Sequence, residues 1–302
     1  MEPALNDIEH IRQLNSRVGW MISDFICNTP RAITCSLMEE MVPDLVSCCR
    51  EDEELSYRSL LGAFCGIDPD NSDDERLIYD TYLAEGVKRL APEPFLSNPY
   101  YQGISIPEVS SGEWSLTYQE YAPYEAFISD DLLLKGDMEI PCVGYFREKF
   151  RYPSVMQAGR EWMSIKPSEI VTSQDAVDKA HGKVVTFGLG LGYFVYMALA
   201  KSEVESVTVV ELDPSVISLF KEYILPQFPR RYDVRIVQSD AFEFMRNMRR
   251  GEFDFAFVDI WHDISDGVQH YVRAREFERL HPQMQFTYWL ERSIRCALAS
   301  SL

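Results

Sequence analysis

Paired cysteines are missing from this sequence of 302 residues. Its seven cysteines form no C-x-x-C pair and have no histidine partner at zinc spacing, which argues against a disulfide framework and against a structural zinc site. The cysteine pattern therefore predicts reduced, buried thiols in a cytoplasmic protein, and no metal held by cysteine.

Long apolar runs are missing as well. The first ten residues contain neither the basic stretch nor the apolar core of a secretion signal. One uncharged run, residues 184–200, is shorter than the roughly 20 residues of a membrane span, and three glycines interrupt it. We therefore expect a protein that is not secreted and does not contact a membrane.

Basic residues are scarce. The chain has 29 lysines and arginines against 48 acidic residues, a formal net charge of −19, which excludes a polyanionic partner such as nucleic acid. The acidity is local: residues 1–150 hold 28 acidic and 11 basic residues, whereas residues 151–302 hold 20 and 18. The acidic half could attract a cationic substrate or partner, but solvated helix faces are the favoured interpretation.

The first hundred residues are predicted to be mainly helical. Apolar residues recur there at three- and four-residue steps, which is typical of amphipathic helices. The predicted helices cover residues 5–27, 31–49, 53–65 and 73–90. Pro92, Pro94 and Pro99 then predict a connector.

The pattern changes to strands between residues 100 and 165. Trp114, Leu116 and Tyr118 alternate with polar residues, as in a half-buried strand, and a second strand is predicted at 140–146. Aromatic residues crowd this stretch, and a packed core explains them better than a ligand cage. These aromatic residues are Tyr145, Phe146, Phe150, Tyr152 and Trp162.

Strands and helices alternate regularly after residue 166. The predicted strands are 183–187, 206–211, 234–238, 253–259 and 285–289. The predicted helices begin near Pro167 and continue at 193–201, 214–223, 240–250 and 266–280. This spacing predicts an α/β fold with a doubly wound parallel sheet. We expect a helical region at 1–98, a β-containing connector at 99–165 and a Rossmann-like domain at 166–302.

Three motifs follow the first three strands of that domain. Gly188, Gly190 and Gly192 allow a sharp turn and close approach of a ligand to the backbone before a helix N-terminus. Glu211 ends the second strand, where a carboxylate can accept both hydroxyls of a ribose. Asp240 follows the third strand.

The order and spacing of these motifs resemble the class I S-adenosylmethionine-dependent methyltransferases. Over residues 183–263 the sequence is similar to their spermidine synthase branch, notably from Val210 to Ile217 and from Phe255 to Asp259. The resemblance implies a Rossmann-like methyltransferase sheet with S-adenosylmethionine as cofactor, and an Asp240 that receives the adenine amino group. The residues that it assigns to the cofactor are Gly188, Gly190, Gly192, Glu211, Leu212, Asp240 and Ala241.

The sequence departs from these families at several points. Many methyltransferases carry an acidic residue two positions before the first glycine, where this chain has Thr186. Spermidine synthases end the fourth strand with two aspartates three residues apart, followed by proline; here Asp259 fits the first position, His262 occupies the second, and no proline follows. The hairpin domain of that family is not recognisable before residue 160, and the usual closing antiparallel hairpin is expected to be absent or supplied elsewhere.

The candidate catalytic residues follow the fourth strand. Asp259, His262 and Asp263 lie where that strand opens toward the cofactor edge of the sheet, and they could act as a general base toward an amine or a hydroxyl. Two alternatives stay open: Asp263 could cap the next helix, or the cluster could ligate a metal. The base or substrate contact is favoured.

The favoured function is a methyltransferase that acts on a small-molecule acceptor, which could be cationic. The alternatives are a polyamine-type aminopropyl transferase and a non-catalytic adenosyl-binding module that recruits a partner. Assembly into a homo-oligomer stays open.

Overall fold

The computed structural model describes residues 5–42 and 49–300, which fold into two compact units. The first unit consists of residues up to 92 together with 120–151, and the second consists of 93–119 together with 152–302. Residues 99–165, expected to form a connector, thus contribute to both units. No helix among the described residues combines the length and the apolar character needed to cross a membrane.

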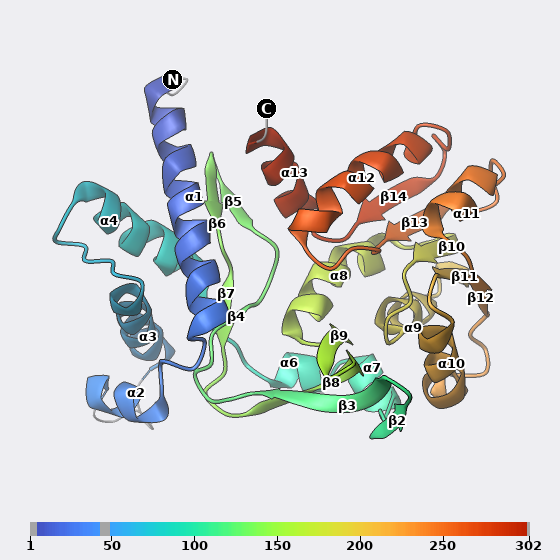
Figure 1. The fold of residues 1–302 in the computed structure, drawn as a ribbon, viewed down its shortest axis with the longest axis horizontal. Coiled ribbons are helices and arrows are strands. Elements are labelled where there is room, and N and C mark those ends of the chain that lie inside the picture. Colours follow the sequence, from blue (N-terminus) through green and yellow to red (C-terminus); the bar gives the residue numbers. More distant parts are fainter. Residues whose placement is uncertain (1–4, 43–48, 301–302) are drawn as a thin grey trace. The chain divides into compact units, whose positions relative to one another are not determined.

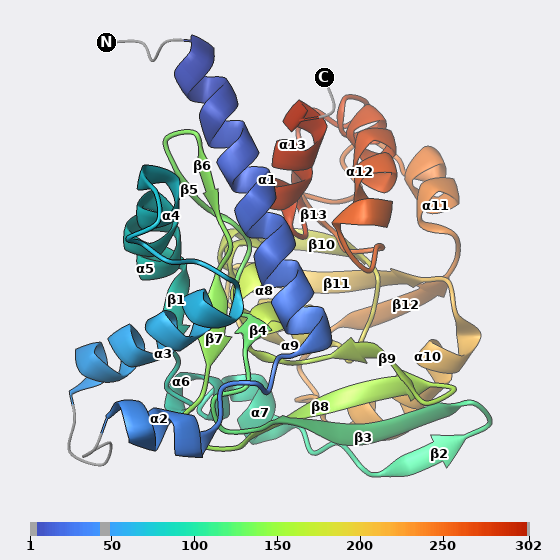
Figure 2. The ribbon, with the colours of Figure 1, turned by 60° about the vertical axis from the view of Figure 1, so that its left-hand side comes forward.

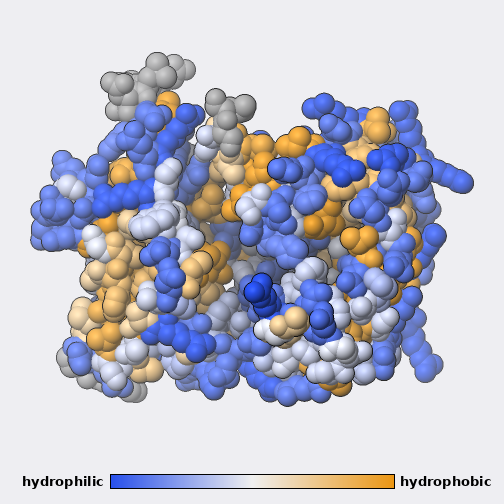
Figure 3. Space-filling view, viewed as in Figure 1, coloured by the Kyte–Doolittle hydropathy of each residue, from blue (hydrophilic) through white to orange (hydrophobic). Residues whose placement is uncertain are grey.

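Helices make up most of the first unit (Figure 1). They are α1 (Leu5–Asn28), α2 (Cys35–Met41), α3 (Arg50–Phe64) and α4 (Asp73–Leu77), the last continuing through a π-helical segment, Ile78–Leu83, into α5 (Ala84–Gly86). The end of the predicted helix 31–49 lies partly outside the described residues. Hydrophilic residues cover the surface over α4 in Figure 3. The first turn of this helix carries the acidic residues Asp73 and Asp74 outside the core and the buried Glu75.

The predicted helix 73–90 is wrong at its C-terminal end. Residues Val87–Arg89 form strand β1, which pairs in parallel with β7 (Val143–Tyr145). The pairing requires Gly86, because a Cβ there would lie 2.3 Å from the carbonyl oxygen of Pro141. Apolar spacing suited a helix, but pairing with a strand distant in the chain decides the structure.

Short strands complete the first unit. Strand β7 also pairs with β4 (Phe127–Ile128), and β5 (Leu133–Lys135) forms a hairpin with β6 (Met138–Ile140). The strand predicted at 140–146 is therefore divided in two, with Pro141 between the parts, where a proline cannot donate a ladder hydrogen bond. Tyr57 stacks on Tyr145 in the core of this unit, with ring centroids 3.7 Å apart.

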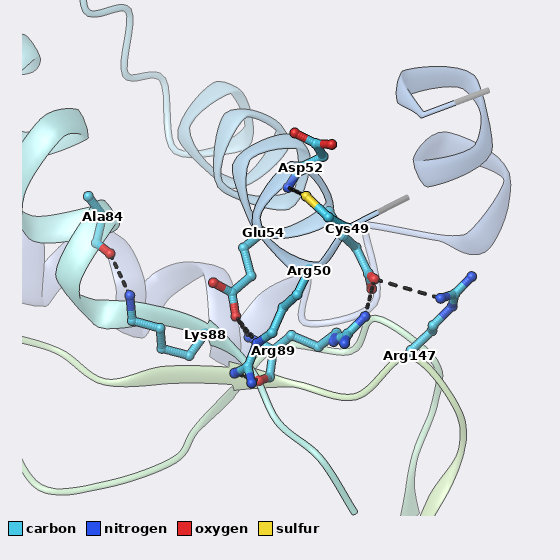
Figure 4. Close-up of polar contacts among 9 residues, drawn as sticks. Cys49, Arg50, Asp52, Glu54, Ala84, Lys88, Arg89 and Arg147 are labelled. Atoms are coloured by element: carbon cyan, nitrogen blue, oxygen red, sulfur yellow. Dashed lines mark hydrogen bonds and ion pairs between the residues drawn. The ribbon is translucent and has the colours of Figure 1, made fainter. Parts of the chain in front are cut away.

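The first unit buries one carboxylate completely. Glu53 of α3 has no exposed side-chain surface, and both Arg89 and Arg147 reach its Oε2 atom. Figure 4 shows these two arginines beside α3. Glu54, the next residue, accepts hydrogen bonds at 2.9 Å from Arg50 Nε and from the backbone N–H of Arg89. The ion pairs of Glu53 with Arg89 and Arg147 thus join α3 to β1 and to the segment after β7.

The second unit contains a five-stranded parallel sheet (Figures 1 and 2). Its strands are β10 (Gly182–Phe187), β11 (Val204–Glu211), β12 (Val234–Gln238), β13 (Phe255–Val258) and β14 (Gln285–Tyr288). The spatial order is β12-β11-β10-β13-β14, and each neighbouring pair is parallel. The predicted α/β fold with a Rossmann-type sheet is confirmed, as are all five predicted strands to within a few residues.

The helices that accompany the parallel sheet follow the predicted alternation. They are α8 (Pro167–Lys179), α9 (Tyr193–Leu199), α10 (Pro214–Leu219), α11 (Ala241–Asn247), α12 (Ile264–Glu278) and α13 (Glu291–Ser300). The strand order reverses at β10, since β11 lies on one side of it and β13 on the other. Phe187, the last residue of β10, is level with Val210 of β11 and Val258 of β13, so the strands end at one edge and open a crevice there. In the described chain this sheet has no antiparallel strand beside β14.

A second sheet lies in the same unit and extends to its boundary. Its order is β2 (Val109–Ser111), β3 (Trp114–Tyr121), β8 (Phe150–Gln157) and β9 (Arg160–Ser164), after the short helices α6 (Glu93–Leu96) and α7 (Pro99–Gly103). The strand predicted around Trp114 is confirmed. Of the five aromatic residues expected in a core, four are buried, but Trp162 on β9 is 41% exposed. The core prediction is therefore wrong for Trp162, which faces a pocket.

Candidate functional site

A pocket of about 460 Å³ opens at the carboxyl ends of the parallel strands. Each strand contributes to its lining through the residue at or just after its end. In the spatial order of the strands these residues are Asp240, Glu211, Gly188, Asp259 and Trp289. Because neighbouring strands lie about 4.8 Å apart, the row spans roughly 19 Å, which suits an extended ligand.

The glycine loop between β10 and α9 is shaped by close approach. Gly188 and Gly190 line the pocket with φ angles of 100° and 53°. A Cβ on Gly188 would lie 2.0 Å from the carbonyl oxygen of Asp259, and one on Gly190 would lie 1.9 Å from Met163 Sδ. Any side chain at either position would therefore push apart the walls of the pocket.

Gly192 supports this loop without lining the pocket. It is the N-cap of α9 with a φ angle of 75°, and a Cβ there would lie 2.3 Å from the ring of Phe220. The loop is also held by Tyr100 of α7, whose buried hydroxyl donates to the carbonyl oxygen of Leu191 at 2.5 Å. Tyr100 carried no sequence signal for this role.

Glu211 anchors the loop and faces the pocket. Its Oε2 accepts from the backbone N–H of Leu189 at 3.0 Å and its Oε1 from that of Asp213 at 2.8 Å. Each carboxylate oxygen keeps a second lone pair for a ligand hydroxyl. Leu212, next in the chain, is 64% exposed and lies in the pocket lining, where it offers an apolar contact.

Asp240 and Ala241 lie at the β12 end of the pocket. Asp240 caps α11 by accepting from the backbone N–H of Glu243 at 2.9 Å through Oδ1, which leaves Oδ2 for a ligand. Ala241, Phe242 and Val216 add apolar surface beside it. A carboxylate beside a narrow apolar surface is suited to a flat ring that carries an amino group.

Two acidic side chains lie at the opposite end of the row. Burial raises the pKa of Asp259 well above its usual value, and the carboxylates of Glu169 and Glu211 raise it further. Burial also raises the pKa of Glu169 to about 7, which Lys166 opposes and Glu161 reinforces. Within residues 5–42 and 49–300, no hydrogen bond or ion pair reaches either side-chain carboxylate.

The other two candidate catalytic residues lie at different depths. His262 lines the rim of the pocket, where its exposed ring packs edge-on against Trp162 at 4.8 Å and its Nδ1 lies 3.3 Å from Asp266 Oδ2. Asp263 is the N-cap of α12 and forms a capping box with Asp266. Of the three residues, Asp263 alone does not line the pocket, and its geometry is that of the capping alternative.

Strand β9 supplies a wall of the pocket that the sequence does not predict. Glu161, Trp162, Met163 and Ser164 line the pocket, and Lys166, which follows them, donates to Glu161 at 3.0 Å. Residues 160–164 do not alternate polar and apolar side chains, and nothing local indicates that they form a strand facing the glycine loop. Among the described residues, no three or more His, Cys, Asp or Glu side chains are arranged to hold a metal ion.

Comparison with known families gives one match, within the second unit. Residues 169–283 match the family model described as the spermine/spermidine synthase domain. That segment begins in α8 and contains the first four strands of the parallel sheet. The resemblance to class I methyltransferases of the spermidine synthase type is thereby confirmed for this part of the chain. A search of curated proteins found no match.

Solved structures match over part of the chain. Spermidine synthase from Thermotoga maritima shares 17% identity over 46% of this chain and 52% of its own, with a TM-score of 0.33. A spermidine synthase in complex with the transition-state analogue AdoDATO shares 19% identity over 37% and 43%, with a TM-score of 0.30. Others are provisionally named as methyltransferases or methylases. This chain spans about half the length of the spermidine synthases that it matches.

Proposed function

We propose that the protein transfers an alkyl group from an adenosyl sulfonium donor to an amine. The carrying observation is the row of pocket residues at the strand ends, with Asp240 and Glu211 on one side of the glycine loop and Asp259 on the other. The residues present fit such a donor. Asp240 would bind its adenine, Glu211 its ribose hydroxyls, and the open backbone at Gly188 would admit the sulfonium centre.

A bound donor supplies a carbon on positively charged sulfur, which leaves as a neutral thioether. The amine nitrogen forms the new bond to that carbon and gives up one proton. Asp259 is the proposed acceptor of this proton, because a carboxylate with a raised pKa is a stronger base than an exposed one. Positioning of the two reactants and exclusion of water supply most of the rate.

Transfer of an aminopropyl group is the favoured form of this reaction. Glu161, Glu169 and Asp259 make this end of the pocket acidic, and Lys166 is the one lysine or arginine among the described lining residues. Since Lys166 is paired with Glu161, a donor tail that carries an ammonium but no carboxylate suits the pocket best. The match of residues 169–283 to the spermine/spermidine synthase domain supports the same choice.

Transfer of a methyl group is the second candidate. The observation that favours it is His262, which stands where the aminopropyl transferases carry their second aspartate and which packs on Trp162. An imidazole and an indole at the rim suit a flatter or less charged acceptor than a polyamine.

Calorimetric titration of the full chain with three ligands tests the proposal. These are S-adenosylmethionine, its decarboxylated form and S-adenosylhomocysteine. Glu211→Ala removes the carboxylate that would accept hydrogen bonds from both ribose hydroxyls. We therefore expect it to weaken binding of all three ligands by about 100-fold or more. Glu205→Ala changes an exposed residue of the same strand and is expected to bind as the wild type does.

The preferred donor then separates the two reactions. Tighter binding of the decarboxylated form, with turnover on amines, supports aminopropyl transfer, whereas turnover with S-adenosylmethionine on amines, thiols or hydroxyls supports methyl transfer. Binding without turnover on any acceptor would indicate the non-catalytic module, and absence of heat with all three ligands would overturn the proposal.

A further inference from the structure

The glycine loop itself offers no acidic group to a ligand. Residues 186–192 contain only threonine, glycine, phenylalanine and leucine. Thr186, which stands where many methyltransferases carry an acid, is 1% exposed, and its hydroxyl donates to the carbonyl oxygen of Gly188 at 3.4 Å. A positively charged ligand group near this loop must therefore find its counter-charge on another element.

Glu169 supplies a carboxylate to the pocket from outside the glycine loop. It lies in the first turn of α8, where the neighbouring Ser168 and Ile170 are buried and fix the helix against the unit. Its side chain lines the pocket and is half-buried. Lys166 is the cation that lowers the pKa of Glu169, but its ion pair is with Glu161.

The sheet order fixes where Glu169 lies along the pocket. Thr172 is one helical turn further along α8, on the same face, and its Oγ1 accepts from the indole N–H of Trp289 at 2.9 Å. Trp289 follows β14, at the far end of the row from Asp240. Glu169 is therefore at the end of the pocket opposite the proposed adenine contact, beside Asp259.

We propose that Glu169 binds the ammonium group at the tail of the sulfonium donor. This inference rests on the proposed function. It holds for either donor, because S-adenosylmethionine and its decarboxylated form both carry an amine at that point. The interaction is a charge-assisted hydrogen bond in a partly buried site, and such bonds are stronger than those between neutral groups. Glu169 is then the replacement, from a different element, for the acid that the glycine loop lacks.

Three nucleosides that differ only in the tail test this role. Decarboxylated S-adenosylhomocysteine carries the ammonium alone, S-adenosylhomocysteine carries the ammonium and a carboxylate, and 5′-methylthioadenosine carries neither. We expect Glu169→Gln to weaken the first ligand by about 10- to 100-fold and to change binding of 5′-methylthioadenosine less than about twofold. Asp178→Asn, an exposed change on the same helix, is the matched control.

The possible failures are distinguishable. If the wild type binds none of the three nucleosides, the proposed function fails with the inference. If the wild type binds all three and Glu169→Gln weakens none of them, or weakens 5′-methylthioadenosine as much as the others, Glu169 does not bind the ammonium and the proposed function stands. Selective loss of the two amine-bearing ligands supports the inference.

Discussion

The two units of this protein treat acidic side chains in opposite ways. In the first unit, Glu53 is completely buried and two arginines, Arg89 and Arg147, reach the same carboxylate oxygen. In the second unit, Asp259 and Glu169 lie in a pocket with no hydrogen-bonding or ionic partner among the described residues. In the first unit the protein's own arginines compensate the charge of the carboxylate. In the second unit only a ligand can do so.

This difference separates a structural carboxylate from a functional one. Removal of one partner from a buried ion pair destabilises the fold, because the remaining charge loses its counter-charge and solvent compensates only in part. A half-buried carboxylate without a partner instead costs stability, and a protein retains such a group mostly where binding or chemistry uses it. The comparison predicts opposite responses to neutralising changes in the two units.

The largest expected effect is on turnover by Asp259→Asn. The amide cannot accept a proton, so we expect the turnover number to fall by about 10²- to 10⁴-fold while donor binding remains. Because the carboxylate is unpaired, the same change should leave the free energy of unfolding unchanged or raise it. His262→Ala is the comparison variant: if it lowers turnover as much as Asp259→Asn does, the imidazole rather than Asp259 is the base.

Glu53→Gln is expected to lower the free energy of unfolding by about 1.5–3 kcal/mol, since it removes the negative charge from a buried carboxylate that two partly exposed guanidinium groups reach. Urea unfolding of the full chain measures this loss. Glu51→Gln, an exposed change in the same helix turn, should cost less than about 0.5 kcal/mol. Equal stability of Glu53→Gln and the wild type would remove the contrast between the two units.

The sequence predicts the parallel sheet well because local and tertiary preferences agree there. The runs Val184–Phe187 and Val207–Val210 are apolar, β-branched or aromatic, and a strand buried on both faces requires that composition. Glu211, Asp240 and Asp259 could be placed at one edge because each lies at or just after the end of a predicted strand. The structure brings all three into one pocket.

Other parts of the site could not be predicted, because tertiary packing alone decides them. Glu169 resembles any acidic residue in a first helical turn, and Trp162 resembles a core aromatic until β9 is placed beside the glycine loop. The strand at Val87–Arg89 has helical spacing in the sequence and becomes a strand only because β7 is available as its partner. Asp263 has a side chain suited both to chemistry and to capping, and only the geometry of α12 shows the cap.

A smaller effect is expected in the pH dependence of stability. Burial raises the pKa of Glu169 from 4.5 to about 7, so between these values the folded chain holds a proton that the unfolded chain has released. The contribution of the protonated Glu169 side chain to stability is complete below pH 4.5 and is lost as the pH rises through 7. Lys166, Glu161 and Asp259 face this carboxylate and act on it in both directions.

Glu169→Gln does not titrate at this position. Its stability relative to the wild type should therefore increase from pH 5 to pH 8, by about 1–3 kcal/mol once solvent contact is allowed for. Urea unfolding of both chains at the two pH values measures the difference. A constant difference across this range would show that the side chain is not kept from water.

The smallest expected effect is at Asp263, the candidate that the structure places at a helix cap. Asp263→Ala removes the acceptor for the backbone N–H of Ser265, at 2.7 Å, and should lower the free energy of unfolding by about 1 kcal/mol. Asp263→Asn keeps a capping oxygen and should retain most of that stability, so the pair of variants separates capping from charge. Should Asp263→Asn instead be as stable as the wild type but lose turnover, the carboxylate of Asp263 would act in the reaction, and the division between paired structural and unpaired functional carboxylates would need a third class.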